Sequence, residues 1–227
     1  MDNVYQRTEQ ILGKENLEIL QKANLCIIGI GGVGSYTIEA LARTGIGNIT
    51  IIDKDIIDAT NINRQLIATK NNIGNIKVEE AKIRIQQINP NVNVNSICDK
   101  INEDNITKYI TEEYDYIIDA IDDVSGKIDI IKRCKEINIP VISCMGTANK
   151  LDPMKLKIAD ISKTEMCPLA KAVRKKLKEQ GITKVKVVFS TEQPKKDKDV
   201  LGSLAYVTGT AGLIIAAEVV KDLMISE

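Results

Sequence analysis

Apolar residues along the first 145 positions fall alternately into short runs and into helical spacing. Short runs that are continuous, or that alternate with polar residues, predict strands at Leu25–Ile30, Asn48–Asp53, Val92–Cys98, Tyr116–Ala120 and Pro140–Cys144. Apolar spacings of three and four predict helices over 8–22 with Thr8 as N-cap, from the turn at 29–34 to Arg43, over Lys77–Ile88 and over Ser125–Ile137. Alternating strands and helices predict an α/β fold, with a doubly wound, mostly parallel Rossmann-like sheet.

The pattern changes after Gly146. Strands are expected at Lys155–Ile161 and Val185–Ser190 around a basic helix at 168–179, followed by a charged loop at 194–199 and a closing helix at Thr210–Met224. We therefore expect one domain over 1–227. Its nucleotide-binding core spans 1–145, and its C-terminal extension, 146–227, supplies substrate and dimer surfaces.

The amino-acid composition limits the catalytic groups and the binding partners that the protein can have. The 31 basic and 31 acidic residues cancel, so no global charge demands a nucleic acid or a membrane. There is no histidine, which excludes imidazole catalysis and leaves Arg, Lys, carboxylates and a metal. The five cysteines form no CxxC pair, so a zinc site is not expected, and Cys26 and Cys144 are expected in the core. The apolar run 211–220 is too short and too charged to span a bilayer, so we expect a soluble, cytoplasmic protein.

A glycine-rich turn, Gly29-Ile30-Gly31-Gly32-Val33-Gly34, stands between the first predicted strand and the helix that follows it. In that context backbone N–H groups and a helix N-terminus can bind phosphate, and glycine lets the phosphate approach closely. Asp53 ends the second strand, where a ribose-binding acid belongs. Up to this point NAD and ATP are equally allowed.

Polar residues beyond the second strand favour ATP. Arg64 can neutralise phosphate charge, Lys77 can add a second point charge, and Asp119 and Asp122 follow a strand end where they could share Mg²⁺. Hydride transfer has no use for so many charges directed at phosphate. The candidate ATP-binding residues are Gly29, Gly31, Gly32, Gly34, Asp53, Asp55, Asn61, Asn63 and Gln65.

Together, GxGGxG, the acid after the second strand, N-x-N-R-Q, the lysine and D-x-x-D resemble the ubiquitin-activating-enzyme (E1)-like superfamily, over roughly residues 20–145. The resemblance implies ATP contacts from Gly31, Asp53, Asn63, Arg64 and Lys77, and magnesium on Asp122. It also implies that Arg7 reaches the ATP of a second subunit in a homodimer. The candidate catalytic residues are therefore Arg64, Lys77, Asp122 and Arg7.

The remaining pieces resemble one branch, the tRNA threonylcarbamoyladenosine dehydratases. They are Arg7–Gly13, Asp119–Asp122, Leu151–Pro153, Pro168–Ala170, Gly202-Ser203, Ala211–Leu213 and Glu218–Lys221. The resemblance implies activation of the threonyl carboxylate on ATP and ring closure onto the carbamoyl group. One departure is Cys167, where the resemblance predicts aspartate.

Three other functions are alternatives to the dehydratase. The first is adenylation of the C-terminal carboxylate of a ubiquitin-like sulfur-carrier protein, against which the missing cysteine pairs count. An NAD(P)-dependent oxidoreductase and an inactive dimeric scaffold are the others. Docking of a sulfur-relay protein stays open.

A basic stripe lies on the helix predicted at 168–179. Lys171, Arg174, Lys175 and Lys178 have spacings that place them on one helix face, with Ala172, Val173 and Leu177 toward the core. Such a run is either a solvated face or a surface for an RNA backbone. With one Phe and no Trp, tRNA recognition would depend on phosphate contacts and shape.

Overall fold

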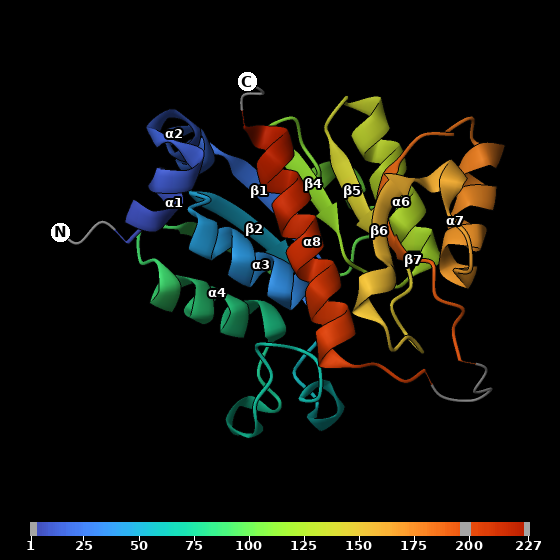
Figure 1. The fold of residues 1–227 in the computed structure, drawn as a ribbon, viewed down its shortest axis with the longest axis horizontal. Coiled ribbons are helices and arrows are strands. Elements are labelled where there is room, and N and C mark those ends of the chain that lie inside the picture. Colours follow the sequence, from blue (N-terminus) through green and yellow to red (C-terminus); the bar gives the residue numbers. More distant parts are fainter. Residues whose placement is uncertain (1–3, 196–200, 225–227) are drawn as a thin grey trace.

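A seven-stranded sheet lies at the centre of the computed structural model, which describes residues 4–195 and 201–224 (Figure 1). The strands are β1 (Asn24–Ile28), β2 (Asn48–Ile52), β3 (Asn93–Ile97), β4 (Tyr116–Asp119), β5 (Val141–Cys144), β6 (Leu156–Asp160) and β7 (Lys186–Ser190). Their order in the sheet is β3-β2-β1-β4-β5-β7-β6, with every neighbouring pair parallel except β6 and β7. The predicted doubly wound, mostly parallel α/β fold is confirmed.

Helices cover both faces of this sheet. They are α1 (Gln6–Leu12), α2 (Lys14–Lys22), α3 (Gly34–Thr44), α4 (Lys77–Ile88), α5 (Ile106–Tyr109), α6 (Val124–Glu136), α7 (Pro168–Glu179) and α8 (Ala205–Leu223). Apolar side chains of α3, α4 and α8 share one core with one face of the sheet, whereas those of α5, α6 and α7 pack on the other face. The central strands are buried on both sides, which explains their continuous apolar sequences.

Small residues let α8 approach α3 closely. An added Cβ at Gly212 would lie 2.5 Å from the Val33 carbonyl oxygen, and one at Gly209 would meet the Tyr36 ring at 3.0 Å. The Thr37 hydroxyl donates to the Gly212 carbonyl oxygen across the contact. The C-terminal extension is therefore packed against the helix that follows the glycine turn, and its strands β6 and β7 extend the same sheet.

Two details of the helix predictions are wrong. The helix expected over 8–22 is two helices, because Gly13 has φ +79° and separates α1 from α2, and α1 begins at Gln6 rather than after Thr8. The closing helix begins at Ala205 instead of Thr210, since Gly209 and Thr208, weak helix formers, are held by their packing on α3 and the turn. The other predicted elements lie within two residues of their expected bounds.

The irregular segment 54–74 is ordered by local contacts. Short 3-10 helices occupy Ala59–Asn61 and Lys70–Asn72, and an isolated bridge joins Ile56 to Ile76.

The short helix α5 lies where the sequence predicted no element. Of the charged loop expected at 194–199, residues 196–199 lie outside the described residues. Within the described parts, no helix is long and apolar enough to cross a membrane.

Candidate functional site

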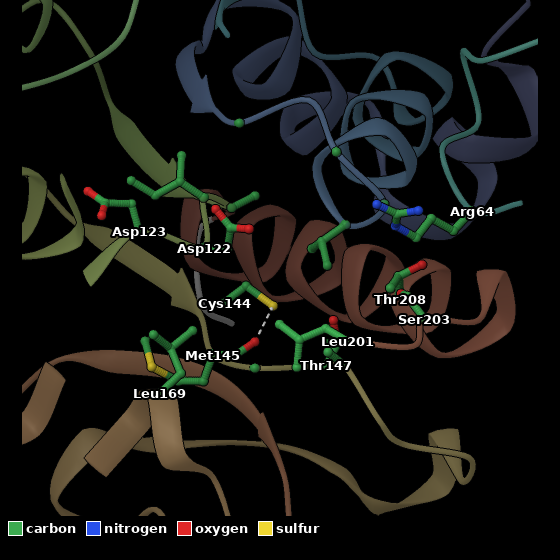
Figure 2. Close-up of a pocket in the computed structure, with 18 of the residues that line it drawn as sticks. Arg64, Asp122, Asp123, Cys144, Met145, Thr147, Leu169, Leu201, Ser203 and Thr208 are labelled. Atoms are coloured by element: carbon green, nitrogen blue, oxygen red, sulfur yellow. Dashed lines mark hydrogen bonds between the residues drawn. The ribbon is translucent and has the colours of Figure 1, made fainter. Parts of the chain in front are cut away.

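A cavity of about 840 Å³ lies at the carboxyl ends of β1, β2, β4 and β5 (Figure 2). The sheet order reverses between β1 and β4, and this switch point is where open α/β sheets bind ligands. The glycine turn, Arg64 and Lys77 form the first wall of the lining, and 144–150 with 167–169 at the start of α7 form the second wall. Figure 2 shows Arg64 and Asp122 on one side of the cavity, with Met145 and Leu169 on the other.

The glycine turn forms the floor beside β1. Gly29 has φ +91°, and an added Cβ there would lie 2.9 Å from the Ala120 carbonyl carbon, so only glycine fits. Gly31 differs, because nothing lies nearer to its added Cβ than the Gln65 Nε2 atom at 4.0 Å. Gly29, Gly31 and Gly32 line the cavity, and Gly31 leaves open the space that a ligand phosphate would need.

Gly34 does not line the cavity, and its predicted contact with ATP stays a prediction. A Cβ at this position would lie 1.8 Å from the Gly29 carbonyl oxygen, behind the turn. Its role is to let the start of α3 pack against the end of β1.

Asp53 fixes the turn to the end of β2. One carboxylate oxygen accepts from the Ile30 N–H at 2.6 Å, and the other accepts from the Asp55 N–H at 2.8 Å. The side chain lines the cavity as predicted for a ribose-binding acid. Both oxygens retain lone pairs for a ligand hydroxyl.

Lys77 is almost fully buried and points into the same wall. Its Nζ lies 3.1 Å from one Asp55 carboxylate oxygen, and Lys54 Nζ lies 2.9 Å from the other. Burial alone would raise the pKa of Asp55, but hydrogen bonds and charge from Lys54 and Lys77 lower it below its ordinary value. The buried ammonium is thus held in place at the first turn of α4.

Arg64 is positioned by polar contacts that involve no acid. Its guanidinium donates to the Thr60 carbonyl oxygen at 2.8 Å and to the Asn63 side-chain oxygen at 2.9 Å. Asn63 in turn donates to the Ser203 carbonyl oxygen at 3.0 Å. Asn63 lies outside the described cavity lining and orients Arg64, and its predicted contact with ATP stays a prediction.

Asn61 and Gln65 line the cavity, and their contacts with ATP stay predictions. Asn61 accepts from the Asp58 N–H and stabilises the 3-10 turn that leads to Arg64. The Gln65 Oε1 atom is buried and has no hydrogen-bond partner among the described residues. Since buried polar atoms normally have partners, this atom fits a ligand donor. Together with the open space at Gly31, it shows that the residues present fit a nucleotide.

The pairing of Asp119 with Asp122 as metal ligands is wrong. Asp119 is fully buried, and its carboxylate is held by Lys127 Nζ at 3.0 Å and 3.1 Å and by the Ser143 hydroxyl at 2.5 Å. It also accepts from the Ile121 N–H, so it supports the loop that carries Asp122.

Asp122 faces the cavity and makes no hydrogen bond within the described residues, whereas its neighbour Asp123 caps α6. No group of three or more metal-ligating side chains occurs in the described parts of the chain. A single carboxylate fits Mg²⁺, because this ion commonly takes one or two carboxylates together with substrate phosphates and water.

Two further predicted groups lie away from the cavity. Arg7 is exposed on α1, so its predicted reach into a second subunit stays a prediction. On α7, Lys171, Lys175 and Lys178 are exposed, but Arg174 is half-buried and donates to the Thr164 carbonyl oxygen at 2.8 Å. The stripe therefore loses Arg174, and Ala172 is exposed rather than packed in the core.

The cysteine predictions hold where the structure tests them. Cys26 and Cys144 are buried, and burial raises the pKa of Cys144 to about 12. Cys167 is also buried and lies at the cavity, where its sulfur accepts from the Ala170 N–H at the start of α7.

Sequence reasoning missed Lys150, which lines the cavity with 3% of its surface exposed. Its neighbours Leu151–Pro153 contribute to the sequence prediction only through the resemblance to the dehydratases. A lysine in a polar loop carries no signal of burial, because the contacts that enclose it come from residues 16 and 42 positions away.

The fold and the cavity define a doubly wound α/β protein with a glycine-rich turn at the switch point of its sheet. Residues 5–225 match the ThiF family, and the chain belongs to that family.

The chain is similar over nearly its whole length to proteins of one named activity. The tRNA threonylcarbamoyladenosine dehydratase of Bacillus subtilis is 42% identical, over 97% of this chain and 94% of the relative. The crystal structure of the Escherichia coli tRNA N6-threonylcarbamoyladenosine dehydratase, TcdA, in complex with ATP superposes with a TM-score of 0.93 at 38% identity, covering 98% of this chain and 96% of that one. A structure of the same E. coli protein in complex with AMP gives the same values.

Proposed function

We propose that the protein catalyses ATP-dependent dehydration of N6-threonylcarbamoyladenosine in tRNA to its cyclic form. The observation that carries the proposal is similarity along nearly the entire chain to the B. subtilis dehydratase, combined with a cavity that fits a nucleotide. This similarity includes the C-terminal extension, so it favours the dehydratase over an enzyme that adenylates a sulfur-carrier protein. The extension, 146–227, supplies the substrate side of the site and surfaces for a second subunit.

The reaction uses ATP as a substrate. A carboxylate oxygen of the threonyl group attacks a phosphorus atom of ATP, the bond to the departing phosphate breaks, and a mixed anhydride forms. The neighbouring carbamoyl group then attacks the activated acyl carbon, the phosphoryl oxygen leaves, and a ring closes with net loss of one water. This second step is intramolecular, so proximity contributes much of its rate.

The cationic side chains of the first wall stabilise the charge that develops on the phosphates. Arg64 is free of acidic partners among the described residues and can offer its remaining N–H donors to phosphate oxygens. Lys77 adds a buried positive charge. Asp122 would hold Mg²⁺, which neutralises phosphate charge when bound.

The macromolecular contacts lie outside the cavity. Lys171, Lys175 and Lys178, exposed on α7, contact the tRNA backbone, and the partner subunit's Arg7 completes the ATP site in a homodimer.

The test is incubation with ATP, Mg²⁺ and tRNA that carries threonylcarbamoyladenosine, followed by mild nucleoside mass spectrometry. An ATP-dependent decrease by the mass of one water supports the proposal. An unchanged nucleoside, together with ATP turnover that depends on the C-terminal carboxylate of a carrier protein, would contradict it.

A further inference from the structure

Lys150 is a buried cation of the cavity lining and belongs to the segment that follows β5. Its Nζ donates to the carbonyl oxygens of Met166, at 3.4 Å, and of Glu192. No carboxylate lies within ion-pair distance of it in residues 4–195 and 201–224. Burial lowers the pKa of this ammonium, and the charge of Glu192 offsets the loss of water only in part.

The nearest carboxylate, that of Glu192, interacts with Lys150 through its charge but makes its hydrogen bonds elsewhere. The Glu192 carboxylate accepts from the backbone N–H groups of Leu151 and Asp152 at 2.9–3.1 Å. Before Pro168, where the resemblance predicts aspartate, the chain has the thiol of Cys167. The N-terminus of α7, a 12-residue helix, belongs to the second wall, as Lys150 does, and adds partial positive charge.

The backbone around Lys150 is fixed on both sides. Asn149, with φ +58°, exchanges two hydrogen bonds with Gly202, through its N–H at 2.8 Å and its side-chain oxygen at 2.7 Å. On the other side, Leu151 and Asp152 are held by Glu192. The ammonium is therefore placed before any ligand arrives, which lowers the entropic cost of binding an anion.

We propose that Lys150 binds the carboxylate of the threonylcarbamoyl side chain, an inference that rests on the proposed function. A lysine has three N–H donors, and the two backbone carbonyls leave one for a carboxylate oxygen. The other carboxylate oxygen stays free to attack ATP.

A tRNA-borne carboxylate suits this position better than an ATP phosphate does. The glycine turn, Arg64 and Lys77 all follow β1 and β2, so the groups suited to phosphate lie on one wall. Lys150 follows β5, which β4 separates from β1 in the sheet, and its Nζ contacts Met166 just before α7. The reaction requires two anions to meet; Arg64 and Lys77 are available to the phosphates, and Lys150 is available to the carboxylate.

The test compares two tRNAs in the presence of a non-hydrolysable ATP analogue. One carries threonylcarbamoyladenosine and the other is the same tRNA without the modification, so contacts to the backbone cancel in the ratio of their dissociation constants. We expect the full-length protein to prefer the modified tRNA about tenfold or more, as for a hydrogen bond to a charged group. In Lys150→Gln, which keeps N–H donors but loses the charge, the ratio should fall to within about twofold, with Kd for the analogue unchanged.

Controls separate the charge from the fold. Lys150→Arg should retain most of the preference, and Lys157→Gln, at an exposed lysine of β6, should retain all of it. Lys150→Met, of similar length, replaces the glutamine variant if that variant unfolds.

Two outcomes overturn the inference: a preference that persists in Lys150→Gln, or weaker binding of the analogue with the preference intact, which would assign Lys150 to ATP. Failure of the unsubstituted protein to dehydrate modified tRNA would instead contradict the proposed function.

Discussion

Gly31 and Gly34 belong to one turn, yet a methyl group would meet different surroundings at the two positions. At Gly31 it would project into open space in the cavity, whereas at Gly34 it would lie 1.8 Å from a backbone oxygen. We expect Gly31→Ala to keep its melting temperature within about 3 °C but to bind ATP at least about tenfold more weakly. Gly34→Ala should lose about 3 kcal/mol or more of stability.

Calorimetric ATP titration and thermal unfolding of both variants check this contrast. Gly74→Ala is a useful reference, because that glycine has positive φ with nothing within 4 Å, so its cost reports backbone strain alone. ATP affinity unchanged in Gly31→Ala would remove the turn from the nucleotide site.

The position of a site residue could be predicted from the sequence where a motif fixes the backbone. It could not be predicted where a side chain can lie either in the core or in the cavity. The glycine turn and Asp53 lie where the pattern placed them. Asp119 and Asp122 look alike in the sequence, yet one is buried against Lys127 and the other faces the cavity. Successive residues at a strand end point to opposite sides of the sheet. Two aspartates three positions apart therefore need not bind the same ion.

At the level of elements, Glu39 joins α3 to α4. Its carboxylate accepts from Arg84 at 2.6 Å and 3.0 Å and from Arg43 at 2.8 Å. Burial alone would raise the pKa of Glu39, but the hydrogen bonds and charges of Arg84 and Arg43 lower it below the ordinary value of 4.5. Ionised Glu39 therefore stabilises the fold fully above that value, and the contribution disappears as pH falls through the folded-state pKa.

We expect Glu39→Gln to lower the free energy of unfolding by about 1 kcal/mol at pH 7, because both arginines are partly exposed and their charges screened. The difference from the unsubstituted protein should shrink steadily from pH 5 downward. Urea unfolding at several pH values measures it, with Glu18→Gln, in an exposed pair, as the comparison. A difference independent of pH would show that packing, not charge, makes the connection.

Element boundaries show which sequence signals are local. Gly13 ends a helix because of its own backbone conformation, yet the apolar spacing continues across it and suggested one helix. The start of α8 depends on α3, which lies far away in the sequence, and no local pattern could place it. The strands were predictable because a buried parallel sheet requires continuous apolar runs.

At the scale of the whole molecule, the net charge is zero, so the protein as a whole does not attract tRNA. Any attraction has to come from local groups such as the exposed lysines of α7. If Lys171, Lys175 and Lys178 contact tRNA phosphates, replacing all three with alanine should weaken binding of every tRNA alike. The slope of log K against log salt should become shallower by about three, or about one per lost contact.

Fluorescence anisotropy over a salt series measures the slope. Alanine at Lys14, Lys22 and Lys108, three exposed lysines on other helices, removes the same charge and should leave the slope nearly unchanged. Equal effects of the two triple variants would mean that the protein binds tRNA through overall charge alone.

Mixing two inactive variants distinguishes whether Arg7 acts within its own chain or across a symmetric dimer. In a dimer of Arg7→Ala and Arg64→Ala protomers, a site that takes Arg64 from one chain and Arg7 from the other contains both arginines, while the second site contains neither. Random mixing of equal amounts makes half of the dimers mixed, so about a quarter of the original activity should return although each variant alone is inactive. Action within one chain predicts no recovery, because every protomer then lacks one arginine.

Coexpression of the two variants with different tags, followed by sequential purification, isolates the mixed dimer and should raise recovery to about half. Light scattering during gel filtration checks that each variant is a dimer before mixing. A monomeric protein with full activity would contradict the shared site.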